Sequence, residues 1–382
     1  RRTALYERGA SQTGPRNGGG KILPERRITE LPAILAGLSQ AQQAVFARIF
    51  HVAATTGELS APEEMHPWIA KYFGSVEAVS RQRIVKVTNL VTMEGALFNE
   101  LRANRPFETG GGTEVRRAIA ESEGDPFCRP ETGTPADLFG RLRGAACVTA
   151  SNVAKYDGFH GLVIFATHDP LRIEREAVRD YVTTARRWAE AARAREPAAR
   201  YYFFLWNCLW KSGASIVHGH AQMTVTKEMH YAKIEGLRRA ARAYGELVYA
   251  EASLRYYFDD LYRVHDMLDL AWEREGVRGF AYLAPIKEKE VVLLAEEEGP
   301  PLYDEVYRIL DGYRRLGVES FNVALIRPPL GEAERDWEGF PAMVRIVDRG
   351  DPNNKTADFG GMELYAASVI ASDPFKVAEM YK

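Results

Sequence analysis

The same succession of secondary structure is predicted twice along this chain of 382 residues. In the first occurrence, β-branched and alternating segments at 147–170 and 200–226 are typical of paired strands, and the amphipathic, Arg- and Glu-rich segment 171–196 is typical of a helix that ends at Pro197. The second occurrence comprises strands at 279–286 and 290–297, a helix at 302–315, and strands at 320–329 and 340–349. Antiparallel sheets with long crossover helices, present twice, predict an internally duplicated α+β fold.

The composition excludes several classes of protein. Apolar residues make up 46% of the chain and the formal net charge is only -2, which is the opposite of what a disordered chain shows. The 50 Lys and Arg residues are balanced by 52 Asp and Glu residues, so no global basic field favours nucleic acid. No apolar run approaches the roughly 20 residues of a membrane helix. Three widely spaced cysteines make no disulfide framework, and together these features predict a cytoplasmic globular protein.

The chain is predicted to have three parts. Residues 1–79 form an N-terminal extension that is partly helical, because apolar residues recur at helical spacing over 28–57 and a second short helix is expected around 67–73. Residues 80–228 and 229–382 are then the two halves of the duplicated fold, and the second half begins with a helical stretch that extends to about residue 275.

One predicted strand carries the candidate catalytic residues. In I-V-H-G-H-A-Q-M-T-V-T, at 216–226, alternation puts His218, His220, Gln222 and Thr224 on one face and apolar side chains on the other. A neutral imidazole is a good nucleophile at physiological pH, and one ring nitrogen can attack while the other is fixed by a hydrogen bond. An amide such as Gln222 can donate to a phosphoryl oxygen without protonating a leaving group. The spacing alone is equally typical of two metal ligands or of a partly exposed sheet face.

The wider motif adds specificity. Gly213, Ser215, His218, His220 and Gln222, preceded by Asn207, form a G-x-S-x-x-H-x-H-x-Q pattern that resembles the active site of the galactose-1-phosphate uridylyltransferase branch of the histidine-triad (HIT) superfamily. Further segments resemble that family in the same order: N-x-x-T-x-E at 89–94, R-A-x-R-P at 102–106, D-P-F-C at 125–128, Asn152, His168, and F-G-G-M-E at 359–363. The resemblance covers roughly residues 80–380.

The resemblance implies a role for each matched residue. His220 is the expected nucleophile, Gln222 the ligand of the phosphoryl oxygens and Ser215 the contact of the leaving phosphate. The expected substrate-binding residues are Arg102, Arg105, Asn152, Asn207, Gly213 and Glu363. Guanidinium groups suit phosphate oxygens, although two arginines beside a strand are also consistent with a solvated surface.

The same resemblance implies a single metal site. The family's zinc ligands correspond to Asp125, Cys128, His168 and His218, with Asp125 in place of the family's first cysteine. Zinc accepts carboxylate, thiolate and imidazole ligands, so this set could form a tetrahedral site. Asp125 is equally consistent with a turn residue before Pro126, and Cys128 with a buried thiol. No histidine follows His265, so no second metal site is expected.

The expected function is nucleotidyl transfer through a covalent nucleotidyl-histidine. The donor is a nucleotide sugar or another nucleoside polyphosphate. A sugar 1-phosphate acceptor makes the chain a uridylyltransferase-like enzyme, and inorganic phosphate makes it a phosphorylase of a nucleotide sugar or dinucleoside polyphosphate. Two alternatives from other classes remain open, a nucleotide-binding module without turnover and a zinc scaffold that uses both histidines as ligands. The resemblance further implies a homodimer.

Overall fold

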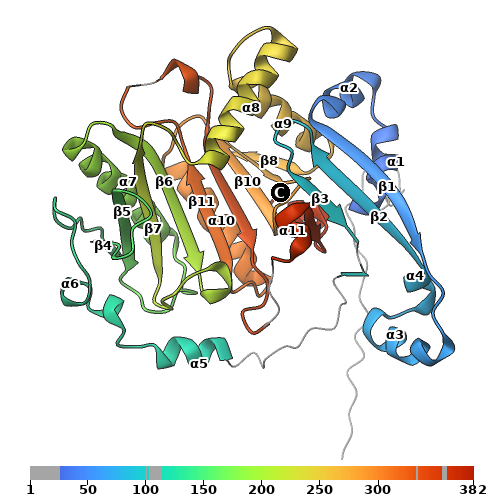
Figure 1. Cartoon of the computed structure of the whole chain (residues 1–382), viewed down its shortest axis with the longest axis horizontal. Coiled ribbons are helices and arrows are strands. Elements are labelled where there is room, and N and C mark those ends of the chain that lie inside the picture. The colour runs from blue at the N-terminus through green and yellow to red at the C-terminus, as the bar shows by residue number, and fades with distance from the viewer. Residues whose placement is uncertain (1–25, 100, 103–113, 333, 355–358) are drawn as a thin grey trace, which may run out of the picture.

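The computed structural model describes residues 26–99, 101–102, 114–332, 334–354 and 359–382 (Figure 1). Within them, the strands form a nine-stranded sheet of order β4-β5-β7-β6-β11-β12-β10-β9-β8 and a four-stranded sheet of order β1-β2-β3-β13. All pairings in the larger sheet are antiparallel. The predicted α+β class with antiparallel sheets is therefore confirmed.

The two ends of the large sheet are built in the same way. The first contains β4 (Cys147–Ser151), β5 (Phe159–Phe165), α7 (Arg175–Arg195), β6 (Ala199–Cys208) and β7 (His220–Lys227). The second contains β8 (Ala271–Arg274), β9 (Val277–Ala281), β10 (Glu288–Ala295), α10 (Pro300–Arg315), β11 (Phe321–Ile326) and β12 (Ala342–Asp348). The spatial order β4-β5-β7-β6 matches β9-β10-β12-β11, and the two sets meet where β6 pairs with β11.

Helix α7 covers one face of the first set of strands. Trp188 of α7 is fully buried, and it lies so close to Gly161 of β5 that a Cβ at this glycine would be 2.7 Å from the indole ring. Gly161 pairs with Met223 of β7, so the apolar residues Ala221 and Met223 face the helix, as their alternation predicts. His220 and Gln222, which alternate with them, point to the face that α7 does not cover.

The predicted helical region at 28–57 is wrong in its second half. Helices α1 (Leu31–Ala36) and α2 (Gln40–Ile49) are present, and Ser39 and Gln42 form a capping box at the start of α2. Residues Phe50–Glu58 form strand β1 instead, paired over its whole length with β2 (Arg81–Asn89). The ladder with β2, about thirty residues away in sequence, overrides the apolar helical periodicity.

The four-stranded sheet is completed by β3 (Gly95–Phe98) and by β13 (Ser368–Ile370), which pairs with β3 in parallel. It lies against the second half of the large sheet (Figure 1). The side chain of Asn89 donates to the hydroxyls of Tyr257 and Tyr282, at 2.9 Å each. Strand β1 belongs to the predicted N-terminal extension, so β2 and β3 share a sheet with that extension. The boundary expected at residue 80 stays a prediction.

The remaining helices complete the fold. Helices α8 (Ala232–Tyr249) and α9 (Arg255–Met267) confirm the helical stretch expected after residue 229 and pack on each other, but its last residues form β8. The shorter α-helices are α3 (His66–Phe73), α4 (Val76–Ser80), α5 (Glu114–Glu121), α6 (Pro130–Gly133), α11 (Gly361–Tyr365) and α12 (Pro374–Glu379). Short 3-10 helices include η4 (Pro126–Cys128) and η5 (Trp210–Ser212). Among the described residues, none of the helices combines the length and apolar character needed to span a bilayer.

Candidate functional site

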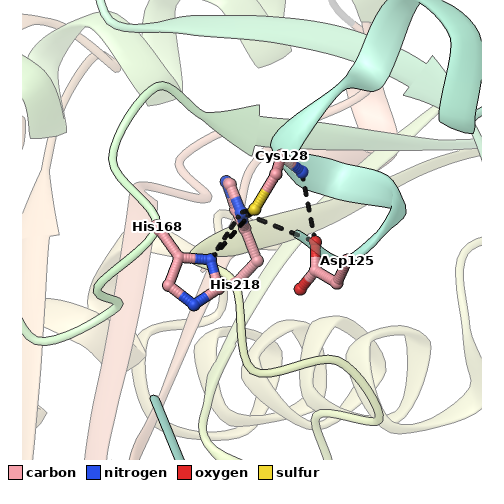
Figure 2. A group of neighbouring side chains, drawn as sticks. All are labelled: Asp125, Cys128, His168 and His218. Carbon is pink, nitrogen blue, oxygen red and sulfur yellow. Dashed lines mark hydrogen bonds and ion pairs between the residues drawn. The ribbon is translucent and has the colours of Figure 1, made fainter. Parts of the chain in front are cut away.

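Four side chains from three separate loops converge beside the start of β7. Asp125 and Cys128 belong to the short turn at η4, His168 follows β5, and His218 immediately precedes β7 (Figure 2). One ligand atom from each lies within 4.8 Å of all the others. Cys128 Sγ is 3.3 Å from His168 Nδ1 and 3.4 Å from His218 Nδ1, and the two Nδ1 atoms are 3.1 Å apart. The four residues predicted as metal ligands are therefore neighbours in space.

The hydrogen bonds of the two histidines leave the Nδ1 atom of each ring free to coordinate a metal. His168 Nε2 lies 2.8 Å from the carbonyl oxygen of Ile119, and His218 Nε2 lies 2.9 Å from that of Phe165. Because a carbonyl oxygen can only accept, the ring nitrogen facing it must carry a proton, so both neutral rings are protonated on Nε2 and present an Nδ1 lone pair to the cluster. Such outer hydrogen bonds are usual around metal-binding histidines.

The donor set fits a zinc ion. Tetrahedral zinc, at about 2.0–2.3 Å from each ligand, holds nitrogen, oxygen and sulfur ligands about 3.3–3.7 Å apart. Four separations in the cluster, from 3.1 Å between the two Nδ1 atoms to 3.7 Å between His218 Nδ1 and Asp125 Oδ1, are close to this size. The second carboxylate oxygen, Asp125 Oδ2, is buried without a hydrogen-bond partner. A buried polar atom in that state is rare, and a metal ligand is one way to satisfy it.

His220 is oriented by the backbone of His218, one of the four cluster residues. It is 5% exposed, and its Nδ1 lies 2.8 Å from the carbonyl oxygen of His218. The proton is therefore on Nδ1, and Nε2 keeps its lone pair. Burial lowers the pKa of His220, which favours the neutral ring. The ring of Phe127 packs edge-on against it, with centroids 5.1 Å apart.

Gln222 lies two residues further along the same strand and face. Its Oε1 is 2.9 Å from Nε2 of His160, a fully buried histidine on β5. Asn152, which follows β4, also reaches this histidine, with Nδ2 3.1 Å from the same nitrogen. The predicted residues Gln222 and Asn152 thus meet at a histidine to which the sequence assigned no role.

The turn between β6 and β7 brings a second group of predicted residues together. Gly213 has a φ of 99°, in the left-handed region that favours glycine, and both Gly213 and Ser215 are exposed. Asn207, at the end of β6, accepts a hydrogen bond from Asn322 Nδ2 at 2.6 Å. Asn322 Nδ2 also donates to the carbonyl oxygen of Ser212, and Arg349 donates to Asn322 Oδ1 at 2.5 Å.

The last predicted substrate-binding residues lie far from His220 in the sequence. Glu363 accepts from the backbone N–H of Gly360 and so caps the short helix α11. The ring of Phe359, just before that helix, packs against the guanidinium of Arg349, which links this segment to the turn at Ser212. Arg102 follows β3 in the chain, and Arg105 lies outside the described residues.

Two residues at the site could be found only through strand pairing. His160 is a polar residue in the otherwise apolar run G-F-H-G-L-V-I-F, and Asn322 interrupts F-N-V-A-L-I in the same way. A polar residue in an apolar strand can be recognised in the sequence, but the sequence does not show which side chain it contacts. The pairing of β5 with β7 and of β11 with β6 supplies Gln222 and Asn207 as those partners.

No protein-family model matches the sequence, and no curated protein matches it. Solved structures do match. An ADP-glucose phosphorylase from Arabidopsis thaliana with bound ADP-glucose superposes with a TM-score of 0.56 at 15% identity, over 77% of this chain and 96% of the other. A GALT-like protein from Arabidopsis thaliana gives 0.56 at 16% identity over the same shares of the two chains. A uridylyltransferase gives 0.50 at 15% identity, over 65% of this chain and 87% of the other.

The chain has the fold of these solved structures, a GALT-like protein and a uridylyltransferase among them. The fold predicted from the motifs is therefore confirmed. Strands β5, β6 and β7 hold the candidate residues, and the Asp-Cys-His-His cluster is where the resemblance put the metal. At these identities the matches establish the fold, while the reaction has to be argued from the residues of this chain.

Proposed function

We propose that this chain is a nucleotidyltransferase that carries the nucleotide on His220. One observation carries the proposal: the His220 ring commits Nδ1 to the carbonyl oxygen of His218 and is left with an unprotonated Nε2 on the face of the sheet shared with Gln222. That is the state required of an imidazole nucleophile. The fold, seen in a phosphorylase of ADP-glucose and in a uridylyltransferase, supports this choice of chemistry.

The proposed reaction is two displacements at one phosphorus. The lone pair of His220 Nε2 attacks the α-phosphorus of a nucleoside diphosphate compound, a P–N bond forms, and the bond from phosphorus to the bridging oxygen breaks. The electron pair leaves on the phosphate of the departing group, which needs no proton. A phosphate oxygen of the acceptor then attacks the same phosphorus, the P–N bond breaks, and Nε2 recovers its lone pair. The hydrogen bond from Nδ1 to the His218 carbonyl stabilises the positive ring of the intermediate.

The neighbouring residues have positioning and binding roles in this scheme. Gln222 donates from its amide nitrogen to the nonbridging oxygens of the transferred phosphoryl group. Ser215 and the backbone at Gly213 receive the departing phosphate in the exposed turn. Asn207 and Asn152 contact the nucleotide, and Glu363 the sugar. Arg102 and Arg105 contact phosphate oxygens, and a homodimer, which the resemblance implies, would let one subunit's arginines serve the other's site.

The metal has a bracing role in the proposal. Zinc held by Asp125, Cys128, His168 and His218 would fix the backbone of His218, whose carbonyl oxygen orients His220. Among described residues, His220 is outside this cluster. The alternative in which both histidines are zinc ligands is therefore less favoured, and it predicts that His220→Ala reduces the bound metal.

The matching order of strands supports a finer statement about the architecture. We infer that residues 80–228 and 229–382 are duplicated HIT-like halves, since β4-β5-α7-β6-β7 and β9-β10-α10-β11-β12 have the same sequence order and the same sheet order. The first half then carries the reacting residues and the second provides the neighbouring strand β11 with Asn322.

Intact-protein mass spectrometry tests the proposal. The protein is mixed with UDP-, ADP- and GDP-sugars and with diadenosine polyphosphates, without acceptor. The expected result is an acid-labile gain of one nucleoside monophosphate that is absent in His220→Ala and retained in His51→Ala, a matched change of an exposed histidine on β1. Nucleotide binding without an adduct from any donor would favour the non-catalytic binding module.

The acceptor is identified in a second step. The nucleotidyl protein is separated from donor and exposed to inorganic phosphate or to a panel of sugar 1-phosphates. Release of a nucleoside diphosphate with inorganic phosphate assigns a phosphorylase. Release of a nucleotide sugar only with a sugar 1-phosphate assigns a uridylyltransferase-like enzyme.

A further inference from the structure

His160 lies beside Gln222 and is held by a backbone donor. It is fully buried on β5, two residues before Leu162, which pairs with Gln222 of β7. Diagonal positions on neighbouring strands share a face, so the two side chains meet, with His160 Nε2 2.9 Å from Gln222 Oε1. On the other side of the ring, the backbone N–H of Tyr156 points at Nδ1 from 2.9 Å.

These contacts determine the tautomer of His160. The N–H of Tyr156 can only donate, so Nδ1 is the acceptor and the proton of the neutral ring is on Nε2. Nε2–H then donates to Gln222 Oε1. The amide nitrogen of Asn152, 3.1 Å from Nε2, is a second donor and makes no hydrogen bond to this tautomer; its Oδ1 already accepts from the backbone of Ala154. Burial lowers the pKa of His160, which keeps the ring neutral.

The second half of the sheet has the same arrangement with different chemistry. Glu290 on β10 lies two residues before Val292, which pairs with Arg345 of β12. The backbone N–H of Ile286 donates to Glu290 Oε2 at 2.7 Å, and Glu290 Oε1 accepts from Arg345 Nε at 2.6 Å. In both halves, a backbone N–H in the loop before the strand fixes a buried polar side chain, which in turn fixes a long side chain on the neighbouring strand.

We propose that His160 is a positioning residue for Gln222: by donating to Oε1, it turns the amide nitrogen of Gln222 outward, where it donates to the nonbridging oxygens of the transferred phosphoryl group. This inference rests on the proposed nucleotidyl transfer. A freely rotating glutamine would present oxygen or nitrogen to the phosphate, and its oxygen would repel the negative charge. With the oxygen held by His160, only the donor end faces the reacting phosphorus, which is preorganisation of the kind that lowers a barrier.

The closing experiment measures the single-turnover rate of nucleotidyl-His220 formation and the donor dissociation constant in a mutant cycle. His160→Leu removes the donor and is expected to slow adduct formation about 10- to 100-fold, somewhat less than loss of a direct transition-state donor, with little change in donor affinity. His160→Gln can still place an N–H near the position of Nε2 and is expected to recover most of the rate. Gln222→Ala slows the wild-type reaction, and His160→Leu added to it has no further effect, because its partner is gone.

The opposite results overturn the proposal. Equal losses from His160→Leu with and without Gln222 would mean that His160 acts on the fold and not through the amide. A loss carried entirely by donor affinity would mean the same. Glu290→Gln is the matched control from the second half, and its folded fraction is expected to form the adduct at the wild-type rate.

A readout without turnover separates this proposal from the proposed function. If the wild-type protein forms no adduct with any donor, nucleotidyl transfer has failed. The contact itself is then tested by NMR of the protein with ¹⁵N-labelled histidine. The expected result is a His160 ring protonated at Nε2 alone, with an Nε2–H resonance that moves in Gln222→Ala and stays in Glu290→Gln. A ring protonated at Nδ1 would overturn the inference.

Discussion

His160 and Glu290 occupy matching positions in the two halves of the sheet, yet they hold very different partners. In the first half, neutral groups make single hydrogen bonds, and Gln222 retains an amide nitrogen that can face a ligand. In the second half, Arg345 lies between two carboxylates, with Nη1 2.6 Å from Glu94 Oε1 and Nε 2.6 Å from Glu290 Oε1. Tyr282 adds a hydrogen bond to the other oxygen of Glu94.

The difference shows how one frame of strands is used for two purposes. Glu94 comes from the turn between β2 and β3 of the small sheet, so the ion pairs of Arg345 attach that sheet to the second half. In the first half, Gln222 occupies the position that corresponds to Arg345. Among the residues described, no side chain of the small sheet contacts it, and a phosphoryl group would bind there in the proposed function. In the proposed function the first half presents polar groups to a ligand, while the second half uses its polar groups to hold the small sheet.

Arg345→Met is expected to have the largest effect on stability. It leaves Glu290, which is 2% exposed, and Glu94 without their cation, and breaking a buried ion pair costs about 3–5 kcal/mol. Urea unfolding should show a decrease in the free energy of unfolding near the upper end of this range, because two carboxylates lose their partner. The double variant Glu290→Gln with Arg345→Met should recover part of the loss. A loss below about 1 kcal/mol, typical of exposed pairs, would contradict the assigned role.

Removal of the metal is expected to lower the free energy of unfolding by nearly as much. A ligand present at a thousand times its dissociation constant stabilises the folded state by about 4 kcal/mol. His168→Ala should therefore lose stoichiometric zinc, measured by elemental analysis, and lower the free energy of unfolding by a similar amount. Cys147→Ala, which changes a buried cysteine outside the cluster, should retain the zinc. Full zinc content in His168→Ala would exclude the cluster as the metal site.

His265, one of two buried histidines in the second half with His230, predicts a pH dependence of stability. Burial of His265 lowers its pKa from 6.5 to about 3. Below pH 6.5, His265 binds a proton in the unfolded chain but stays neutral in the folded chain. The free energy of unfolding therefore falls as the pH falls, by about 1.4 kcal/mol per pH unit. Between pH 6.5 and pH 5 this group alone removes about 2 kcal/mol.

The measurement is urea unfolding at several pH values. His265→Phe should flatten the dependence by one proton, while its ring can still pack against Phe280 and Tyr282. The variant is expected to be less stable at neutral pH, because the backbone N–H of Leu283 loses its acceptor. An unchanged slope would show that His265 is not the group responsible.

A pair of glycine substitutions gives the smallest expected effect. Gly213 has a φ of 99° and Gly276, in the turn between β8 and β9, a φ of 78°. Alanine in this region costs about 1 kcal/mol at either position. Only Gly213→Ala should also slow adduct formation, since Gly213 lies in the turn expected to receive the departing phosphate. Equal rates of adduct formation in both variants would show that this turn does not contact the departing phosphate.

The sequence predicted much of the site because the motif is local. His218, His220 and Gln222 lie within five positions of one strand region, and their spacing is enough to put a nucleophile beside an amide. The four cluster residues came from the resemblance, and they lie in three separate loops whose meeting no periodicity could predict. The strand at 50–58 was missed because its partner, β2, lies elsewhere in the chain.

The sequence by itself determined the class of the fold, the alternation that separates the apolar face of β7 from its polar face, and the identity of the candidate nucleophile. Those properties depend on neighbours within a few residues. Only the tertiary structure decided which nitrogen of His160 carries its proton, that Gln222 is its partner, and that Arg345 attaches the small sheet. Each of these depends on hydrogen bonds between strands or loops far apart in sequence, and such bonds are set by the register of the sheet.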